Sequence, residues 1–372
     1  QLIIGVPGSG KSWELTRLAD ELREAGAIVA RHYCYLEPGD EMVEQRVTTD
    51  VFFGNVLAEL IDADPALSGA GGARFAAGIG ELEATLIKAA STGQPVILVI
   101  DGLDHIARVR SQARRLSEDE TDIVERLATV NIPAGVALVV GSQPGEHLTP
   151  LCERWGDQLT TRHLPPWSLS DLEAIAVLHG LSSALVAVGI ASQEDIYAIH
   201  ALLAERADGN PLYARYLACG LVAGLKDGSI ASPTDWIADA PAIKGDVAAY
   251  YAHLYGHANQ QAKSIADLIG VIDFSVSEQE LREIVGALVG EWVPQALIQL
   301  APILTTATGQ GGVRIFHESF RRFMTQELPR QGRSVAAALE PVIAWLEHRG
   351  LLGDAKSYRY LLPALRRAGR GD

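Results

Sequence analysis

The eight residues from Gly5 to Ser12 read GVPGSGKS and constrain this chain more than any other segment. They fit the pattern G-x-x-x-x-G-K-[ST], in which a glycine-rich turn wraps a phosphate group with its backbone N–H groups. A short apolar run, 2–4, precedes the turn as a buried first strand should, and a helical pattern follows from Trp13. The alternative is a glycine-rich turn that matches by accident. The candidate nucleotide-binding residues are Gly5, Val6, Pro7, Gly8, Ser9, Gly10, Lys11, Ser12 and Trp13.

A second motif agrees with the first. Residues 95–101 read PVILVID, five consecutive apolar residues that end in the carboxylate of Asp101. Such a run is typical of a central strand in a parallel sheet that is covered by helices on both faces. An aspartate at the carboxyl end of this strand would face the glycine-rich turn at 5–12, the P-loop, and would bind Mg²⁺ together with Ser12. Lys11 would reach the β- and γ-phosphates of the nucleotide. Asp104 supplies a second carboxylate three residues on. The candidate catalytic residues are Lys11, Asp101 and Asp104. The alternative for the two aspartates is that they are ordinary turn residues after a strand.

Composition narrows the class of protein. The chain has 372 residues, 48% of them hydrophobic, but no apolar run approaches the ~20 residues that cross a bilayer, so we expect a soluble, cytoplasmic protein without a membrane partner. A net charge of −15 argues against a broad surface for nucleic acid. The three cysteines are odd in number and widely spaced, which favours reduced thiols over a disulfide framework.

The first half of the chain alternates strand and helix patterns, which predicts an α/β fold with a doubly wound parallel sheet over residues 1–166. Because the chain begins inside the first strand, we expect this domain to lack its N-terminal part and the polypeptide to be longer. The remaining strands are expected at 27–35, 96–100, 136–140 and 159–164, and the helices at 50–62, 80–90 and 117–130.

After Pro166 the patterns become helical. A small helical domain is predicted over 167–244. Within it one helix is expected to end at 207–210, and Pro211 would be the first residue of the next helix. The last part of this domain, 229–244, is expected to be a linker. Residues 245–330 offer helices and then two strand-like runs around the glycines at 309–312, which is typical of a winged helix. Residues 331–372 are expected to be the helical start of a C-terminal sensor or repeat region.

The order of these motifs resembles the STAND class of P-loop NTPases, the signal-transducing ATPases with numerous domains, and the NACHT type more than the plant NB-ARC type. The motifs are the P-loop, the DGLD at 101–104, a polar end on the fourth strand, a Gly-x-Pro turn at 209–211 and FHESF at 316–320. The resemblance covers about residues 2–328. It implies that Asp101 binds the metal and that Asp104 polarises the attacking water.

The same resemblance implies that Pro211 packs on the adenine and that His317 contacts the β-phosphate of bound ADP in a closed state. The chain departs from the family pattern at two positions: His105 stands where the family usually has glutamate, and Gln143 stands where it often has an arginine that senses the γ-phosphate. Both changes predict slow hydrolysis with intact binding. The alternatives are an ordinary first-turn proline at Pro211, a core histidine at His317 and a strand-end residue at Gln143.

The expected function is therefore an ATP-binding, slowly hydrolysing signal-transduction switch with ATP/ADP and Mg²⁺ as cofactors. Its nucleotide state would control homo-oligomerisation and the activation of an attached effector, in bacterial antiviral defence. An unknown activating ligand or phage protein would bind through a C-terminal region beyond this segment. The alternative is an ATP-gated transcription regulator that binds DNA through its winged helix. A metabolic P-loop kinase is a third possibility, but no acceptor site is evident for it.

Overall fold

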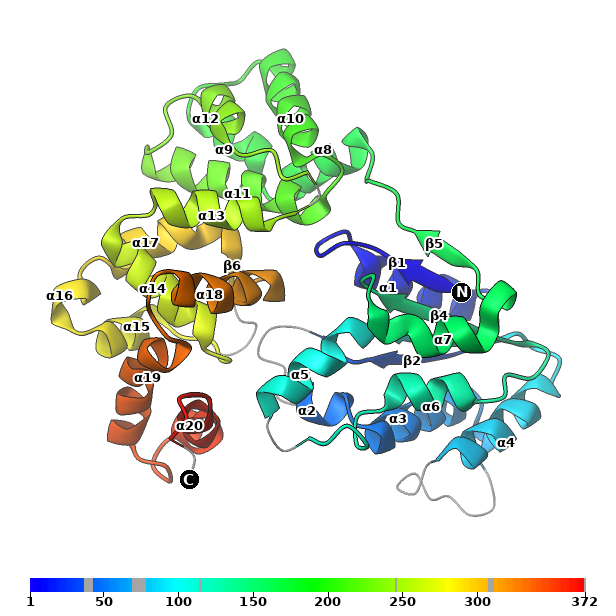
Figure 1. Cartoon of the computed structure of the whole chain (residues 1–372). Helices are drawn as coiled ribbons and strands as arrows, with labels where there is room; N and C mark the ends of the chain where they lie inside the picture. The colour runs from blue at the N-terminus through cyan, green and yellow to red at the C-terminus, as the bar shows by residue number, and fades with distance from the viewer. Residues whose placement is uncertain (37–42, 69–77, 114–115, 245, 307–310, 371–372) are drawn as a thin grey trace. The chain divides into compact units, whose positions relative to one another are not determined.

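The computed structural model describes residues 1–36, 43–68, 78–113, 116–244, 246–306 and 311–370 (Figure 1). Backbone contacts divide the chain into two compact units, the first ending at Leu164 and the second beginning at Pro165. Each unit is described by itself below. Among the described residues no single helix is long and apolar enough to cross a bilayer. The helices α8 (Leu169–Leu178) and α9 (Leu181–Ala187), which meet at a bend of 61°, reach that length and composition only together.

The first unit is built on a parallel sheet of five strands in the order β2-β3-β4-β1-β5. The sheet confirms the parallel α/β fold that the alternating sequence pattern predicts. All six residues of β3 are buried, as a strand with helices on both faces requires. The strands are β1 (Leu2–Ile4), β2 (Ile28–Tyr33), β3 (Val96–Asp101), β4 (Val136–Ser142) and β5 (Thr161–His163).

Alternate side chains of the strands enter two cores, one on each face of the sheet. Leu98 and Ile100 of β3 pack into the larger core, whereas Ile97 and Val99 face the smaller core together with Leu15 of α1. The helices of this unit are α1 (Lys11–Glu24), α2 (Val43–Arg46), α3 (Thr49–Ala63), α4 (Ile79–Ala90), α5 (Ile106–Ala113), α6 (Ile123–Thr129) and α7 (Thr149–Trp155), with short 3₁₀ turns η1 (Pro65–Leu67), η2 (Leu103–His105), η3 (Glu146–Leu148) and η4 (Gly156–Gln158).

One predicted helix of the first unit is much shorter than expected. The pattern over 117–130 predicts a helix that is capped at Ser117, but α6 begins only at Ile123. Ser117 and Glu120 instead close a local turn, in which the Ser117 backbone N–H and hydroxyl both donate to the Glu120 carboxylate, at 2.9 and 2.8 Å. Serine and acidic residues that hydrogen-bond locally compete with helix formation in this way.

The second unit is helical up to residue 303. Its helices are α8 (Leu169–Leu178), α9 (Leu181–Ala187), α10 (Gln193–Ala207), α11 (Pro211–Asp227), α12 (Pro233–Asp239), α13 (Ala248–His257), α14 (Gln260–Val271), α15 (Glu278–Val285), α16 (Ala287–Gly290), α17 (Val293–Leu300), α18 (Glu318–Arg330), α19 (Val335–Arg349) and α20 (Ala355–Arg367), with a 3₁₀ turn η5 (Ala301–Ile303).

The first helix of this unit begins with a reciprocal capping box between Ser168 and Asp171. One local prediction in this unit is wrong. The segment at 229–244, which was expected to be a linker, contains helix α12. The Ser232 side chain caps this helix by accepting a hydrogen bond from the Asp235 N–H, and Pro233 lies in its first turn. The serine and proline that suggested a linker are the residues that begin this helix.

Two short antiparallel strands, β6 (Leu304–Thr306) and β7 (Val313–Ile315), follow α14, α15 and α17. Val276, between α14 and α15, forms an isolated antiparallel bridge to Val313. Gly312 has a φ of 113° and its Cα lies against this bridge: a Cβ there would be 2.6 Å from the Val276 carbonyl oxygen. Residues 307–310, which include part of the predicted glycine turn, lie outside the described residues.

The C-terminal helices α19 and α20 pack into the same hydrophobic core as α14 and α15. Lys356 of α20 donates to Glu280 at 2.6 Å, and the indole N–H of Trp345 in α19 donates to Glu283 at 2.9 Å. Arg367 forms an ion pair with Asp273. Residues 165–370 thus form a single unit, and the finer boundaries at 244 and 330 stay predictions.

Candidate functional site

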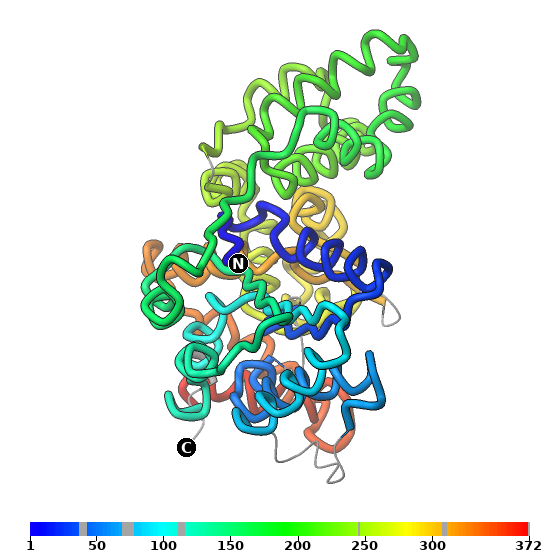
Figure 2. The backbone as a smooth tube through the Cα atoms, turned by 90° about the vertical axis from the view of Figure 1, so that its right-hand side faces the viewer, coloured from blue at the N-terminus to red at the C-terminus, as the bar shows by residue number. Residues whose placement is uncertain are grey.

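The P-loop sequence forms the loop between β1 and α1, in the dark blue part of the chain near the N-terminus (Figure 2). Gly8 and Gly10 have φ angles of 76° and 87°, a left-handed conformation that side-chain-bearing residues rarely adopt. A Cβ on Gly5 would overlap the hydroxyl of Ser9. The Lys11 ammonium lies back over the loop and donates to the Gly5 carbonyl at 2.8 Å. The glycines are therefore required by the turn itself, and Lys11 is positioned at its mouth.

Asp101 lies beside this loop although a strand separates β3 from β1 in the sheet. The intervening strand β4 places Gly141 in register with Asp101. A Cβ on Gly141 would overlap Leu15 and lie 2.6 Å from Asp101 Oδ1, so this glycine leaves the space that the carboxylate occupies. Asp101 accepts a hydrogen bond from the Ser12 hydroxyl, which joins the two predicted metal-binding residues.

The electrostatics of Asp101 follow from its burial. Burial raises the pKa of the carboxyl to about 6, while the Ser12 hydrogen bond and the Lys11 charge pull the pKa down. Asp101 and Ser12 offer carboxylate and hydroxyl oxygens, the hard donors that Mg²⁺ prefers. A buried carboxylate that is held by a hydroxyl and faces a lysine fits a Mg²⁺–phosphate site.

Asp104 is presented by the 3₁₀ turn η2, which follows Gly102 in the left-handed conformation, φ 83°. Both of its carboxylate oxygens accept hydrogen bonds from Gln143 at the end of β4: the backbone N–H donates at 3.1 Å and the side-chain amide at 2.7 Å. The carboxylate is thus oriented by the neighbouring strand. Sequence reasoning assigned no such contact to Gln143, because the two residues are 39 positions apart.

An aromatic and cationic group flanks Asp104 and was not predicted. The His105 ring stacks on Tyr35 with ring centroids 4.4 Å apart and planes 3° from parallel. The Arg108 guanidinium lies 4.9 Å from the centre of the Tyr35 ring and donates to Nδ1 of His105. With Nδ1 accepting, the His105 N–H is at Nε2, which lies 3.6 Å from Asp104. His105 therefore faces Asp104 with a donor.

A further histidine supports the end of β4. His147 Nε2 is hydrogen-bonded to the Ser142 hydroxyl at 2.8 Å, and the Ser142 carbonyl lies 3.4 Å from the Gly5 N–H at the start of the loop. Burial lowers the pKa of His147, so its ring is neutral near pH 7. Ser142 therefore connects the end of β4 with both the P-loop and His147.

The remaining predicted site residues have the following surroundings. Trp13 is 57% exposed, with Arg17 5.9 Å from the centre of its ring. Pro211 is the first residue of α11, where Asn210 caps the helix by accepting the Tyr213 N–H at 3.0 Å. This confirms the predicted helix stop and restart. Pro211 and His317 both belong to the second unit, and their contacts with a nucleotide stay predictions.

His317 has a local structural role that was not predicted: it is the N-cap of α18. Its Nδ1 accepts the backbone N–H of Ser319 at 3.2 Å and is hydrogen-bonded to the Ser319 hydroxyl at 2.7 Å. Because Nδ1 accepts a backbone N–H, a neutral His317 carries its proton on Nε2. The His317 side chain is half-buried, so it is not a fully buried core residue.

Comparison with known proteins gives one family match and several structural likenesses. The family model for the N-terminal region of nephrocystin 3 matches residues 2–131, which include the P-loop and Asp101. Residues 1–164 thus carry the P-loop motif on a parallel α/β sheet, and the family match covers residues 2–131 of this unit. No curated protein matches the chain.

The similar solved structures are distant. The STAND protein with a tetratricopeptide repeat sensor from Pyrococcus horikoshii is 12% identical with a TM-score of 0.41, over 100% of this chain and 45% of that one. The ORC2 protein of Aeropyrum pernix is 12% identical with a TM-score of 0.36, over 88% of each chain. The Walker-type ATPase of Pyrococcus abyssi is 12% identical with a TM-score of 0.38, over 87% and 90%. The chain spans less than half the length of the STAND structure.

Proposed function

We propose that this protein is an ATP-binding signal-transduction switch of the STAND class and NACHT type, which hydrolyses ATP slowly and whose nucleotide state controls self-association. The observation that carries the proposal is the meeting of Lys11, Ser12 and Asp101 at a turn in which Gly8 and Gly10 have left-handed backbone angles. Oligomerisation, an attached effector, an activating ligand or phage protein, the cytoplasmic setting and the role in bacterial antiviral defence rest on the family resemblance.

The loop and the start of α1 would bind the phosphates. Lys11 now donates to the carbonyl of Gly5 and would exchange that partner for the β- and γ-phosphate oxygens. The N-terminal end of α1, which begins at Lys11 itself, adds the positive end of the helix dipole at the same point. These residues provide affinity for a polyphosphate whether it is ATP or ADP.

The Ser12 hydroxyl and the Asp101 carboxylate would hold Mg²⁺. When bound, Mg²⁺ neutralises the charge of the β- and γ-phosphates. Lys11, whose charge already lowers the pKa of Asp101, favours the ionised form of the carboxylate that a cation requires.

The surroundings of Asp104 support slow hydrolysis. Asp104 would orient the attacking water and accept its proton. Two hydrogen bonds from Gln143 hold this carboxylate in place. Gln143 is uncharged, so this position has no arginine to stabilise the transition state. A switch needs a bound nucleotide that outlives the signal, and slow chemistry serves that purpose.

We extend the proposal to a winged helix with a nucleotide-sensing histidine. Its support is the order α14, α15, α17, β6, β7 with the Val276–Val313 bridge, which is the helix-and-hairpin order of that fold. His317 follows the hairpin directly and has its N–H on Nε2, the donor that a β-phosphate of ADP would need. The alternative of DNA binding is not favoured: α17 contains no lysine or arginine, and α15 has three glutamates and one arginine.

Mass photometry with each nucleotide tests the switch. The protein is measured with Mg²⁺ and ADP, and with Mg²⁺ and a non-hydrolysable ATP analogue. We expect larger particles with the analogue than with ADP, and the size distribution of Lys11→Ala should be the same in both conditions. Identical distributions of the parent protein in ADP and in the analogue would contradict a nucleotide-controlled assembly.

A further inference from the structure

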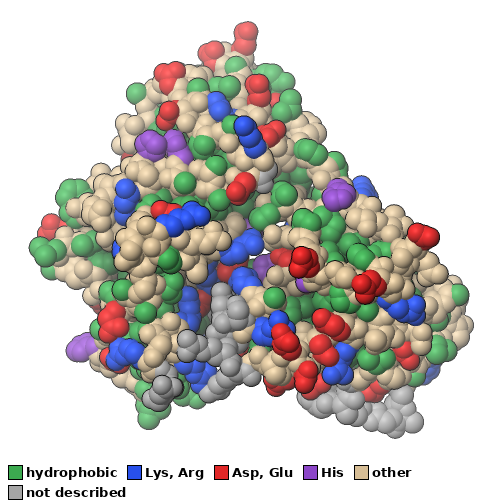
Figure 3. Space-filling view, viewed as in Figure 1, with side chains coloured by type: hydrophobic (Ala, Val, Ile, Leu, Met, Phe, Trp, Pro, Cys, Tyr) green, Lys and Arg blue, Asp and Glu red, His purple; other side chains and the backbone are tan. Residues whose placement is uncertain are grey.

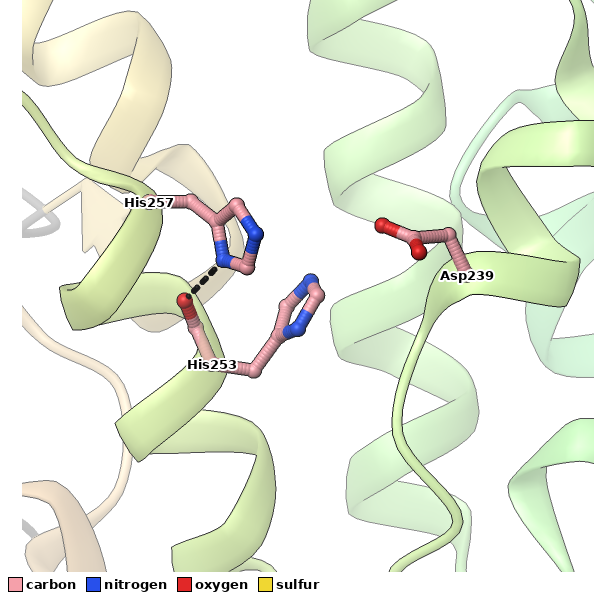
Figure 4. A group of neighbouring side chains, drawn as sticks. All are labelled: Asp239, His253 and His257. Carbon is pink, nitrogen blue, oxygen red and sulfur yellow. Dashed lines mark hydrogen bonds between the residues drawn. The ribbon is translucent and has the colours of Figure 1, made fainter.

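A histidine pair on α13 and an aspartate at the end of α12 lie together in the second unit, outside the proposed nucleotide site (Figure 4). His253 and His257 are four residues apart, so they project from the same side of the helix, and their ring centroids are 4.2 Å apart. One ligand atom from each histidine and one oxygen of Asp239 lie within 4.8 Å of one another. Figure 3 shows histidine side chains gathered at the surface over α12 and α13.

The tautomer of His257 is set by a hydrogen bond. Its Nδ1 lies 2.8 Å from the backbone carbonyl of His253. A carbonyl oxygen can only accept, so Nδ1 carries the proton and Nε2 keeps its lone pair. Metal-binding histidines usually donate the second ring N–H in this way, because the bond orients the ring and raises its basicity.

His253 is the half-buried member of the group, whereas Asp239 and His257 are exposed. Figure 4 shows its ring beside that of His257, on the side of α13 that faces Asp239. A neutral imidazole is the form that coordinates a cation.

The segments that carry the three side chains are held in place by the rest of the second unit. Arg206 donates to the carbonyl of Ala238 at 2.8 Å, and the Tyr213 hydroxyl donates to the carbonyl of Pro241 at 2.7 Å. These bonds fix the backbone on both sides of Asp239. Helix α13 itself is anchored by three buried tyrosines, Tyr250, Tyr251 and Tyr255. Supported side chains of this kind are what a metal site requires.

We propose that Asp239, His253 and His257 form a binding site for a divalent transition-metal ion, Zn²⁺ in particular. Two imidazole nitrogens and one carboxylate oxygen are a known zinc donor set, with water in the fourth position. The ligand atoms would close to about 3.3 Å from one another, the spacing of a tetrahedron with ligands about 2 Å from the metal. Imidazole donors favour zinc over Mg²⁺, which prefers oxygen, so this site is distinct from the nucleotide site. The ion would tie the end of α12 to α13.

Isothermal titration of the untagged, metal-free protein with ZnCl₂ tests the proposal. We expect one Zn²⁺ per chain at this site and no competition from millimolar Mg²⁺. His253→Ala and His257→Ala should each weaken binding about tenfold or more, and Asp239→Asn should weaken it as well. The matched controls are His348→Ala, an exposed histidine on α19, and Asp235→Asn, one turn earlier on α12; both should bind Zn²⁺ as the parent does.

A thermal-unfolding measurement keeps the test independent of whether a variant loses some stability. ZnCl₂ should raise the Tm of the parent and of both controls, EDTA should reverse the rise, and the three site variants should show no rise. Failure of the parent to bind Zn²⁺, or binding that survives both histidine variants, would overturn the proposal. A loss of binding in the control variants equal to that in the site variants would overturn it too.

Discussion

Gln143 donates two hydrogen bonds to Asp104, one from its backbone N–H at 3.1 Å and one from its side-chain amide at 2.7 Å. The pair joins the end of β4 to the turn after β3. Only the side-chain bond depends on the identity of residue 143. The geometry of the proposed water-orienting carboxylate therefore depends partly on a side chain that can be changed without altering the backbone contact.

Replacement of this glutamine tests its positioning role. In Gln143→Leu the side-chain bond is lost while the size is kept, so Asp104 becomes free to turn away from the attacking water. We expect turnover of ATP to fall about tenfold with a change in nucleotide affinity of less than about threefold. Single-turnover hydrolysis and a binding titration measure the two effects, with the exposed Gln158→Leu as control. Unchanged turnover, or an equal loss of affinity, would show that Gln143 does not position Asp104.

The two aspartates should separate by function. Asp101 is hydrogen-bonded to Ser12, so Asp101→Asn should remove the part of ATP affinity that depends on Mg²⁺. Asp104→Asn should keep ATP bound and slow its hydrolysis by a factor on the order of a hundred, which favours the assembled state. ATP titrations with and without Mg²⁺, together with phosphate-release rates, distinguish them. The separate roles are refuted when both variants lose affinity and turnover alike.

His317 requires two variants, because the structure gives it a helix-capping role besides the predicted contact with ADP. His317→Ser keeps a good N-cap for α18 but removes the Nε2 donor, whereas His317→Ala removes both. A charge-assisted hydrogen bond to a phosphate is worth about 1.5–3 kcal/mol, so both variants should release ADP about tenfold faster and assemble more readily in ATP.

Only His317→Ala should in addition lose about 1 kcal/mol of stability, since it alone lacks the cap. ADP dissociation rates and urea unfolding measure the two effects. ADP release from His317→Ser at the rate of the parent would leave His317 with the capping role alone.

The buried His32 should make stability depend on pH. Burial lowers its pKa to about 4, while its Nε2 donates to the Arg46 carbonyl at 2.9 Å. Between pH 6.5 and 4 the unfolded chain binds a proton that the folded chain refuses, so the free energy of unfolding falls as the pH is lowered, by at most about 3 kcal/mol. Asp101, with its pKa raised to about 6, acts in the opposite direction over part of this range.

The comparison with His32→Gln isolates the contribution of this histidine. Glutamine keeps a donor for the Arg46 carbonyl but does not titrate, so the variant should lose less stability than the parent between pH 6.5 and 4. Urea unfolding at several pH values measures the difference, and His348→Gln, an exposed histidine, serves as the control. Parallel curves for the parent and His32→Gln would contradict the buried neutral histidine.

The strands and the P-loop could be predicted because their signals are local. Apolar runs such as 96–100 need both faces buried, and the glycines at 8 and 10 are required by the turn in which they lie. The sheet order could not be predicted, since it depends on which strands pair. As a result, the role of Gly141 beside Asp101 and the bond between Gln143 and Asp104 became visible only in the structure.

Errors in the helices had local causes as well. Ser117 suggested a cap but closes a turn with Glu120, and Ser232 suggested a linker but begins α12. Serine, aspartate and proline serve caps and turns alike, so composition alone does not separate them. The four-residue spacing of His253 and His257 is visible in the sequence, but their proximity to Asp239 depends on the tertiary fold, which brings the end of α12 to these two side chains.

Binding of ATP and ADP to the parent and to Lys11→Ala tests the central claim most directly. Lys11 supplies the one side-chain cation that the loop places at its mouth, and the loop amides alone do not balance the charge of a triphosphate. A calorimetric titration in the presence of Mg²⁺ should show binding of both nucleotides to the parent and none to Lys11→Ala, while the two proteins unfold at similar urea concentrations. Equal nucleotide affinity of the parent and the variant, or no binding to the parent, would contradict the account.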